Sequence, residues 1–324
     1  MSYLVQERSQ SNGGGSLALA YLFLTIYPYG IFFFMGFSVY ALFGIFKDKS
    51  FLFIVLLYAL YWFLDRRSPY NGASRYKRIR ALIMPRTDLH LSHYFPVNIK
   101  KGTCSYPKRS VFGYHPHGLQ PFAWLAMSGW PDKPYDLATA AFFHWWIPGW
   151  RELLMTAGCI DACSSACANA LQENNSIIIA PGGIKETKYC LCPNPVRIIL
   201  RDGFFRLALM HASALVPVLN FGELELFLVS KDVNPLLYLL QKASSRVFGL
   251  RMPTFKGGNM QVYPAKRAID VYFGKAIMIP VNQKNPTQSQ VDALRSVYEG
   301  QLREMYRRYR RSPYGEELII QKLG

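Results

Sequence analysis

The sequence lacks the short motifs of several large enzyme classes. It has no Gly-x-Ser-x-Gly elbow, no His-Glu-x-x-His site and no Walker phosphate loop. A His-x4-Asp box is absent too, because the fifth residues after His115 and His117 are Gln120 and Phe122. These absences argue against a serine hydrolase and against a zinc protease.

Acidic residues are scarce relative to basic ones. The 324 residues contain 37 Lys and Arg against 20 Asp and Glu, and this net charge of +17 favours an anionic surface or an anionic ligand. No zinc finger, RNA-binding aromatic motif or basic zipper is present, so nucleic acid is not an expected partner. Membrane phosphates and a phosphorylated substrate fit better, since hydrophobic residues reach 51% and aromatic residues 15%.

Cysteine is also scarce, with six in a chain far longer than the small secreted domains that depend on disulfides. The thiols are therefore predicted to be reduced and to face the cytosol. Cys159, Cys163 and Cys167 would share one face of a helix, but no fourth ligand has the spacing of a metal site. Buried thiols are the expectation there, and no metal is predicted.

Charge is missing altogether from residue 17 to residue 46, a run of 30 residues where a membrane-spanning helix needs about 20. A four-residue polar turn separates it from a second apolar run, residues 51–64. The pattern predicts a helical hairpin over 17–64 that spans the membrane twice or re-enters one leaflet; the alternative is a buried hairpin in a soluble core. Basic residues after the hairpin place both of its ends in the cytosol.

Three other segments complete the predicted organisation. Residues 1–16 are polar and are predicted to be a disordered tail. Residues 65–108 interleave cations with tyrosines and are predicted to lie against anionic headgroups. In residues 109–324, strands and helices alternate, which indicates an α/β domain. The predicted strands are 111–114, 137–143, 176–180, 214–219 and 269–273, and the predicted helices include 151–157, 164–172 and 204–211.

The last predicted helix, residues 291–309, carries an apolar stripe and is expected to pack on the domain. The stripe consists of Val291, Leu294, Val297, Tyr298, Leu302, Met305, Tyr306 and Tyr309.

Two imidazoles stand at the end of the first predicted strand of this domain, in His115-Pro116-His117-Gly118. This turn cannot continue the strand, because Pro116 lacks an amide hydrogen and Gly118 relaxes the backbone. Histidine accepts a proton near neutral pH, so an imidazole fixed at a strand end is a candidate general base. From the tetrapeptide alone, the alternative is a turn whose imidazoles satisfy hydrogen bonds or bind a metal.

Two further loops follow strands at the edge where such domains form their sites, at 181–186 and 220–223. Gly182 and Gly183 allow a ligand to approach the backbone, and Glu186 is placed to orient one of the histidines. Nearby cations suit a phosphate, although a solvated surface has the same composition. These cations are Lys185, Lys188, Arg197 and Arg201.

Several motifs occur in a fixed order along the chain. They are Tyr94-Phe-Pro96, Phe112-Gly-Tyr-His-Pro-His-Gly118, Gly182-Gly183-x-x-Glu186, the segment 201–208, and 215–218 running on to Phe221-Gly-Glu223. Segments 149–152, 158–161 and 273–278 and the last helix fit the same pattern. This ordered set resembles the type-2 diacylglycerol acyltransferase family, and with the hairpin the resemblance covers about residues 17–310.

The resemblance implies an acyltransferase-like mixed sheet with flanking helices. It implies an enzyme of the endoplasmic reticulum membrane, or of lipid droplets, whose catalytic domain faces the cytosol. The implied reaction moves an acyl group from acyl-CoA, a co-substrate and not a bound cofactor, to an alcohol, which in most members is diacylglycerol.

On this basis His117 is expected to be the general base, with His115 close behind and Glu186 as the orienting carboxylate. Substrate contacts are expected from Gly118, Gly182, Gly183, Lys185, Arg201 and Glu223. Monoacylglycerol, wax-alcohol and sterol acyltransferases share the motifs, so the acceptor stays open. A non-catalytic membrane lipid-binding protein is the alternative from a different class, but it has no need of a base. The sequence also leaves homo-oligomer formation open.

Overall fold

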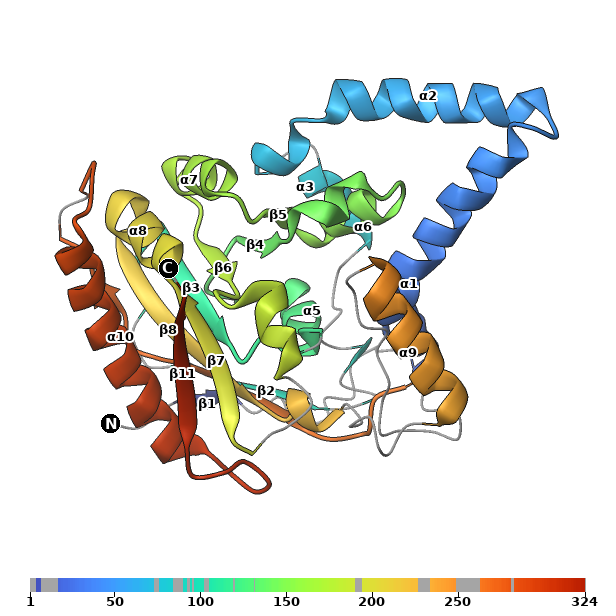
Figure 1. The fold of residues 1–324 in the computed structure, drawn as a ribbon. Coiled ribbons are helices and arrows are strands. Elements are labelled where there is room, and N and C mark those ends of the chain that lie inside the picture. Colours follow the sequence, from blue (N-terminus) through green and yellow to red (C-terminus); the bar gives the residue numbers. More distant parts are fainter. Residues whose placement is uncertain are drawn as a thin grey trace.

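The computed structural model is a mixed α/β domain with a pair of N-terminal helices (Figure 1). It describes residues 4–6, 17–72, 76–83, 90–91, 94, 96–101, 105–118, 120–130, 132–189, 194–226, 234–248, 263–280 and 283–323. Within them, a nine-stranded mixed sheet has the order β1-β2-β9-β8-β3-β6-β4-β5, with β10 beside β8. The strands of this sheet are β1 Leu4–Gln6, β2 Val97–Lys101, β3 Ser110–His115, β4 Leu137–Ala140, β5 Cys159–Asp161, β6 Ile177–Ile179, β8 Ala214–Phe221, β9 Ile269–Phe273 and β10 Ile277–Met278.

The helices include short 3-10 segments, which are labelled η. In chain order they are α1 Leu17–Gly44, α2 Lys49–Asp65, η1 Ser68–Tyr70, α3 Lys77–Ile83, α5 Phe122–Ser128, η3 Phe142–Trp146, α6 Trp150–Ala157, α7 Ser164–Gln172, η4 Gly183–Lys188, α8 Asp202–His211, η5 Glu223–Leu226, α9 Pro235–Phe248 and α10 Gln288–Tyr309.

Strand β3 lies inside the sheet, parallel to β8 on one side and to β6 on the other. All six of its residues are buried, as expected for a strand that is covered on both faces. Gly113 is required within it, because a Cβ at this position would lie 2.0 Å from the hydroxyl oxygen of Tyr298. Glycine thus lets a tyrosine from α10 reach the end of β3, next to His115.

Helix α10 packs with α8 against the sheet, and Val291, Tyr298, Leu302 and Tyr306 are buried on its inner face. The predicted packing is confirmed, except that Val297 lies off this face and is 54% exposed. A second sheet, not predicted from the sequence, consists of β7 (Val196–Arg201) running parallel to β11 (Leu318–Leu323). Strand β7 contacts α8, and β11 contacts α10.

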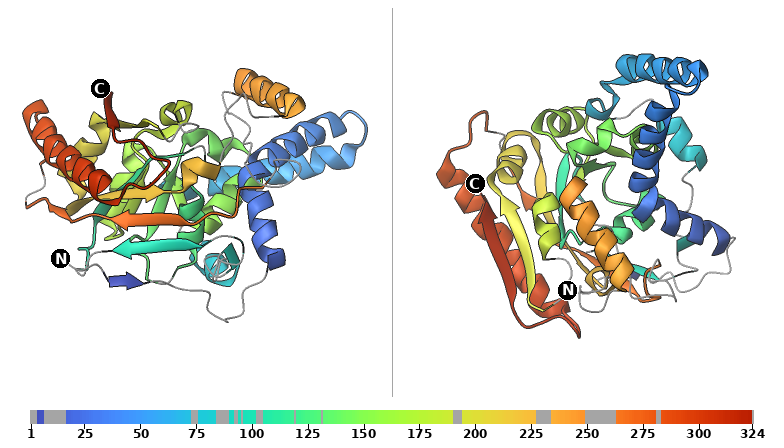
Figure 2. Two further views of the ribbon diagram at one scale, coloured as in Figure 1. Left: turned by 90° about the horizontal axis from the view of Figure 1, so that it is seen from below. Right: turned by 45° about the vertical axis from the view of Figure 1, so that its right-hand side comes forward.

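The apolar N-terminal run forms α1 and α2, which project from the domain (Figure 2). The axis of α1 bends by 62° at residue 28, where proline lacks the amide hydrogen that a helix needs. No single described helix has both the length and the apolar composition that a membrane crossing needs. The two arms of α1 on either side of the bend, taken together, do have that length and composition. The predicted pair of helices is present, and its entry into a membrane stays a prediction.

The far end of α2 is fixed to the domain by a buried ion pair. Asp65, its last residue, accepts from Arg151 of α6 with 3.1 Å between Oδ2 and Nη2, and both side chains are at most 1% exposed. The hydroxyl of Tyr58 also donates to Glu152 at 3.1 Å. Removing one partner of a buried ion pair is strongly destabilising, so these contacts hold α2 against α6.

The basic segment 65–108 is partly built into the domain. Arg80 of α3 donates to the main-chain oxygens of Met155 and Thr156, and β2 pairs with β9. Residues 73–75, 84–89, 92–93, 95 and 102–104 lie outside the described residues. Contact of this segment with headgroups stays a prediction.

Most predicted elements of the domain have the expected bounds. Strand β9 and helix α7 agree residue for residue, and β3, β6, β8, α6 and α8 differ by one or two residues at their ends. The predicted strand 137–143 is wrong after Ala140, where the chain leaves the sheet and turns into η3. The aromatic residues of η3 pack against α2 and α6 instead of continuing the sheet.

Two other expectations are corrected. Residues 4–6 of the predicted disordered tail form β1, because their backbone pairs with β2; the rest of 1–16 lies outside the described residues. Cys159, Cys163 and Cys167 do not share a helical face, because the chain passes from β5 into α7 between the first and the last. All three are free thiols, as the reduced state predicts, whereas Cys104, Cys190 and Cys192 lie outside the described residues.

Candidate active site

A cavity of about 240 Å³ opens at the carboxyl ends of the parallel strands β3, β4 and β6. This is the edge at which α/β sheets form their sites. The wall is largely apolar and includes Tyr27, Ile31 and Phe32 of α1, so the apolar N-terminal helix closes one side. His117 and His144 are among the polar residues that line it.

His117 lines this cavity, and its own turn sets which ring nitrogen carries the hydrogen. Its Nδ1 lies 2.7 Å from the main-chain oxygen of Gly118, which can only accept, so Nδ1 carries the hydrogen of the neutral ring. Nε2 then keeps its lone pair, and no bond to it is recorded among the described residues. Burial lowers the pKa of His117 from 6.5, which keeps the ring neutral at physiological pH. The arrangement suits a general base.

His115 occupies a different environment, although it is only two residues away. It is fully buried at the end of β3 and does not line the cavity. Its Nε2 lies 2.9 Å from the hydroxyl of Tyr298, and burial lowers its pKa to about 3. The geometry therefore brings His117 to the cavity and leaves His115 in the core behind it.

Glu186 holds the backbone of the turn and not an imidazole. One carboxylate oxygen accepts from the amide of His117 at 2.6 Å and the other from the amide of Ile199 at 2.9 Å. Its side chain folds back over Gly182, where a Cβ would lie 1.9 Å from Oε2. Burial raises the pKa of Glu186 to about 7, and the two amide bonds oppose this rise. Glu186 thus reaches His117, but through the main chain.

The three glycines predicted to contact substrate surround the same turn. Gly118 and Gly183 have φ of 68° and 52°, a left-handed conformation that glycine adopts without strain. Gly183 lines the cavity, and Gly118 supplies the oxygen that holds the His117 ring. Their predicted contacts with substrate, and that of Gly182, stay predictions.

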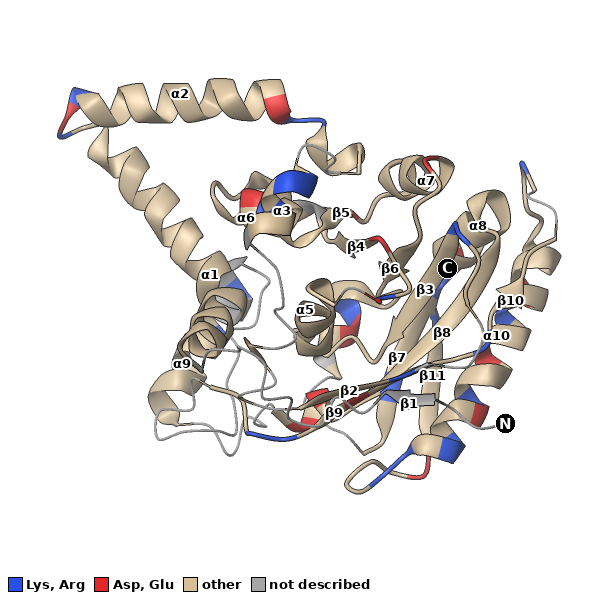
Figure 3. Cartoon of the chain, turned by 180° about the vertical axis from the view of Figure 1, so that it is seen from behind, with Lys and Arg blue, Asp and Glu red and all other residues tan. Residues whose placement is uncertain are grey.

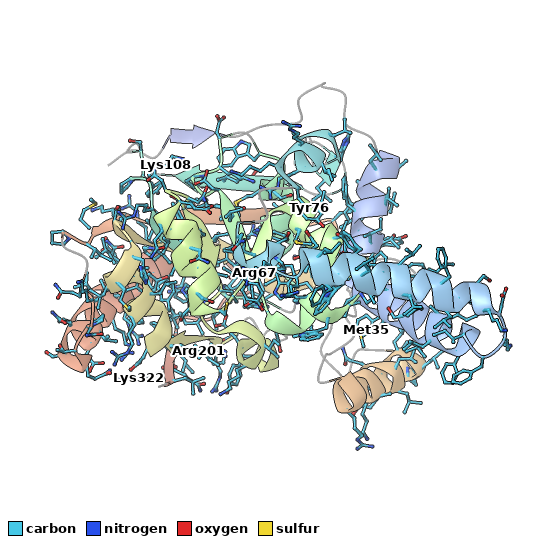
Figure 4. The ribbon with its side chains drawn as sticks, turned by 90° about the horizontal axis from the view of Figure 1, so that it is seen from above. Met35, Arg67, Tyr76, Lys108, Arg201 and Lys322 are labelled. Carbon is cyan, nitrogen blue, oxygen red and sulfur yellow. The ribbon has the colours of Figure 1, made fainter. Side chains whose placement is uncertain are left out.

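The predicted cationic set lies beside the cavity and not in its wall. Arg201, at the end of β7, donates to the main-chain oxygen of Gly182 at 3.1 Å, and the side chain of Lys185 is exposed. Arg197 lies 5.7 Å from the ring centroid of Tyr189, and the side chain of Lys188 lies outside the described residues. In Figure 4, Arg201 and Lys322 lie on one side of the domain and Met35 of α1 on the other.

Glu223 is also buried away from the cavity. Its Oε2 accepts from the hydroxyl of Tyr114 at 2.6 Å, and its Oε1 from the amide of Ala123 at 2.5 Å. Burial raises its pKa to about 8. These contacts tie the first turn of α5 to the end of β3, so they favour a positioning role; the predicted substrate contact stays a prediction.

His144 is not predicted as a site residue from the sequence; it lies in η3, one residue beyond the predicted strand 137–143. Its Nδ1 accepts from the indole of Trp150 at 2.9 Å, and Trp150 lines the cavity as well. Burial and the nearby His117 lower the pKa of His144 to about 3. The only sequence signal is the closely spaced aromatic run Phe142-Phe-His-Trp-Trp146, which by itself indicates a core.

Comparison with known proteins decides the family. The sequence matches the Diacylglycerol acyltransferase family over residues 43–321. The chain belongs to this family. The matched diacylglycerol acyltransferase region contains both histidines of the turn, Glu186 and η3, whereas the α1 residues of the cavity wall lie before it. Membership makes the protein an acyltransferase of lipid biosynthesis, and acyl-CoA and a lipid acceptor are its implied substrates.

Individual relatives within the diacylglycerol acyltransferase family act on different acceptors by name. Human 2-acylglycerol O-acyltransferase 1 is 27% identical over 84% of this chain and 86% of its own length. Human acyl-CoA wax alcohol acyltransferase 1 is 30% identical over 78% of this chain and 81% of its own length. Diacylglycerol O-acyltransferase 2 of Xenopus laevis is 29% identical over 79% of this chain and 76% of its own length. No solved structure matches the chain significantly.

Proposed function

We propose that this protein transfers the acyl group of acyl-CoA to the free hydroxyl of diacylglycerol, giving triacylglycerol. The observation that carries the proposal is the unprotonated Nε2 of His117 in an apolar cavity. An alcohol is a weak nucleophile until it loses its proton, and a neutral imidazole within hydrogen-bond reach removes that proton as attack begins. Diacylglycerol is the acceptor that the family is named for and that several relatives share.

The reaction needs no proton from outside the cavity. The acceptor oxygen bonds to the thioester carbon as its proton moves to Nε2 of His117. The C–S bond then breaks, and CoA leaves as a thiolate, which takes the proton back from the imidazolium. A thiol has a pKa of about 8.5, so its thiolate leaves readily and a strong general acid is unnecessary.

The proposed location is the cytosolic face of the endoplasmic reticulum membrane, with the lipid droplet as a second site. In its support, α1 carries no charge and α2 carries charge only at its two ends (Figure 3). Large apolar side chains of both helices are exposed, such as Phe33 at 67% and Leu64 at 71%. Trp146 and the α9 residues Leu236 and Leu239 are exposed to a similar degree. A bilayer would cover these surfaces.

The proposed donor contact is between the phosphates of CoA and the cations beside the cavity. Arg201 and Lys185 flank the loop of Gly182 and Gly183, and the pantetheine arm of CoA would span the distance between phosphates held there and a thioester beside His117. Arginine suits the role because its planar guanidinium makes two parallel bonds to phosphate oxygens.

The test is an acceptor panel. Microsomes that contain the full chain are given labelled oleoyl-CoA with diacylglycerol, monoacylglycerol, a long-chain alcohol or a sterol, and the products are separated. Labelled triacylglycerol that is absent from His117→Ala microsomes is the expected result. A different labelled ester with the same dependence on His117 would replace the acceptor and keep the mechanism. Lipid binding without any ester would support a non-catalytic lipid-binding protein.

A further inference from the structure

His144 and His117 line the same cavity with opposite hydrogen-bonding character. The indole N–H of Trp150 can only donate, so Nδ1 of His144 must accept from it and carries no hydrogen. The hydrogen of a neutral His144 ring is therefore on Nε2. In His117 the assignment is reversed, because Nδ1 donates to Gly118 and Nε2 carries the lone pair.

The donor on His144 is available to a ligand. Among the described residues no partner of its Nε2 is recorded, and the ring is part of the cavity wall. The ring stays neutral while His117 takes up a proton, because burial and the charge of His117 both lower the pKa of His144, to about 3. It thus offers one N–H at the stage of the reaction when negative charge develops on the substrate.

The tautomer is set by a tryptophan that has little freedom to move. Trp150 is 3% exposed and stands at the start of α6. A Cβ at Gly30 of α1 would lie 2.7 Å from its ring, so the helix and the indole are in close contact. Phe34 of α1 packs beside it, with 6.5 Å between ring centroids. Contacts with helix α1 therefore hold Trp150 in the position from which it donates to His144.

We propose that His144 is a second catalytic residue, which donates its Nε2 hydrogen to the thioester carbonyl oxygen of acyl-CoA, and that Trp150 is its positioning residue. The proposal rests on the acyl transfer proposed above. As the acceptor oxygen bonds to the carbonyl carbon, the electron pair of the C=O bond moves to oxygen, where the hydrogen bond from His144 stabilises it. When the pair returns, the C–S bond breaks, and no hydrogen of His144 is consumed.

The first test is kinetic, and it separates the effect of losing the Nε2 hydrogen of His144 from the effect of losing its aromatic ring. His144→Phe keeps an aromatic ring without an N–H, and His144→Gln supplies an amide N–H of similar reach. Loss of one oxyanion donor costs about a hundredfold or more in kcat. We expect this loss in His144→Phe, a KM for acyl-CoA within about twofold of wild type, and recovery of most of kcat in His144→Gln. Trp146→Phe, in the same 3-10 helix but exposed, is the matched control for disturbance of η3.

The second test reads the tautomer without turnover. The chain contains six histidines, so ¹⁵N-histidine spectra of the full protein in nanodiscs, compared with His144→Gln, assign this ring. We expect a hydrogen on Nε2 and none on Nδ1, and a mixture of tautomers in Trp150→Phe, with a several-fold lower kcat.

The outcomes distinguish this proposal from the one on which it rests. An active wild type with full kcat in His144→Phe, or with a hydrogen on Nδ1 of His144, would overturn the donor role alone. A wild type that forms no ester with any acceptor would overturn the acyl-transfer proposal, and the donor role with it.

Discussion

The end of β3 and the turn after it carry one histidine each, and the two differ in their hydrogen-bond partners and in their access to the cavity. His115 is fully buried, and one of its nitrogens is engaged by Tyr298. His117 faces the cavity, and its ring is held by the main chain of the turn itself. The difference teaches that two identical side chains in one short motif can have separate roles when a single proline, Pro116, turns the chain between them.

The largest expected effect comes from removing the imidazole on the cavity side. His117→Ala should lower kcat by about a hundredfold or more, because a positioned general base contributes that much. Folding and membrane association should be unchanged, since Glu186 binds the amide of this residue and not its ring. Initial rates and solubilised yield measure both. Retention of more than half of the wild-type rate would assign the chemistry to another residue.

A carboxamide at Glu186 should have the next largest effect. Glu186→Gln keeps one acceptor oxygen but places an amide NH2 against one of the two main-chain N–H groups that donate to Glu186, and a buried unpaired donor costs about 1–3 kcal/mol. We expect a loss of tenfold or more in kcat, because the turn that holds His117 shifts. Glu223→Gln is the matched control, since the hydroxyl of Tyr114 can accept as well as donate. Equal losses in both variants would indicate a general effect of burial.

Arg201 is not part of the comparison between the two histidines. Its substitution tests the proposed contact with the phosphates of acyl-CoA. Arg201→Ala should raise the KM for acyl-CoA by about tenfold with little change in the KM for the acceptor, because a charge-assisted bond to phosphate contributes about 1.5–3 kcal/mol. Lys322→Ala is the control, since Lys322 lies on the neighbouring strand and already pairs with Asp292 at 2.9 Å. A fall in kcat alone would show that Arg201 acts by holding Gly182.

Removing the partner of His115 should have a smaller effect on turnover. Tyr298→Phe leaves a buried imidazole nitrogen without its bond, at a cost of about 1–2 kcal/mol of stability, with a few-fold loss in kcat. Tyr306→Phe, also in α10, loses a bond to the main-chain oxygen of Gly315 but lies away from the turn. Thermal unfolding should respond similarly in both variants, and kcat only in Tyr298→Phe. Unchanged kcat in both would make His115 a purely structural residue.

The smallest effect is on the pH profile. His117 must be neutral to accept a proton, and burial lowers its pKa below 6.5, so kcat/KM should fall only as the pH drops below this value. A solvent-exposed histidine would lose half of its activity near pH 6.5. Rates between pH 5 and 8 in mixed buffers measure the midpoint. A midpoint above 6.5 would mean that a different group controls the acid limb.

The sequence predicts the part of this site that is local in the chain. The turn at 115–118 follows from proline and glycine after an apolar strand, and the strand and helix bounds around it follow from periodicity. The partner of Glu186 does not follow, because sequence spacing cannot tell a carboxylate that binds an amide from one that binds a ring.

The parts that the sequence does not predict depend on long-range packing. The pairing of β7 with β11 joins segments more than 100 residues apart. His144 lies in an aromatic run that has the composition of a strand, and only contacts with other elements turn it into η3. An apolar run such as α1 indicates an anchor, and nothing in its composition says that Tyr27, Ile31 and Phe32 also line a cavity.

The shared use of α1 has a kinetic consequence. With α1 in the bilayer as proposed, the cavity that it closes is reached from the lipid phase, and the acceptor never has to dissolve in water. The concentration of acceptor that sets the rate is then its mole fraction in the membrane. Adding inert phospholipid at a fixed total amount of acceptor should slow the enzyme by surface dilution, whereas acyl-CoA, arriving through water, should obey ordinary saturation in bulk concentration.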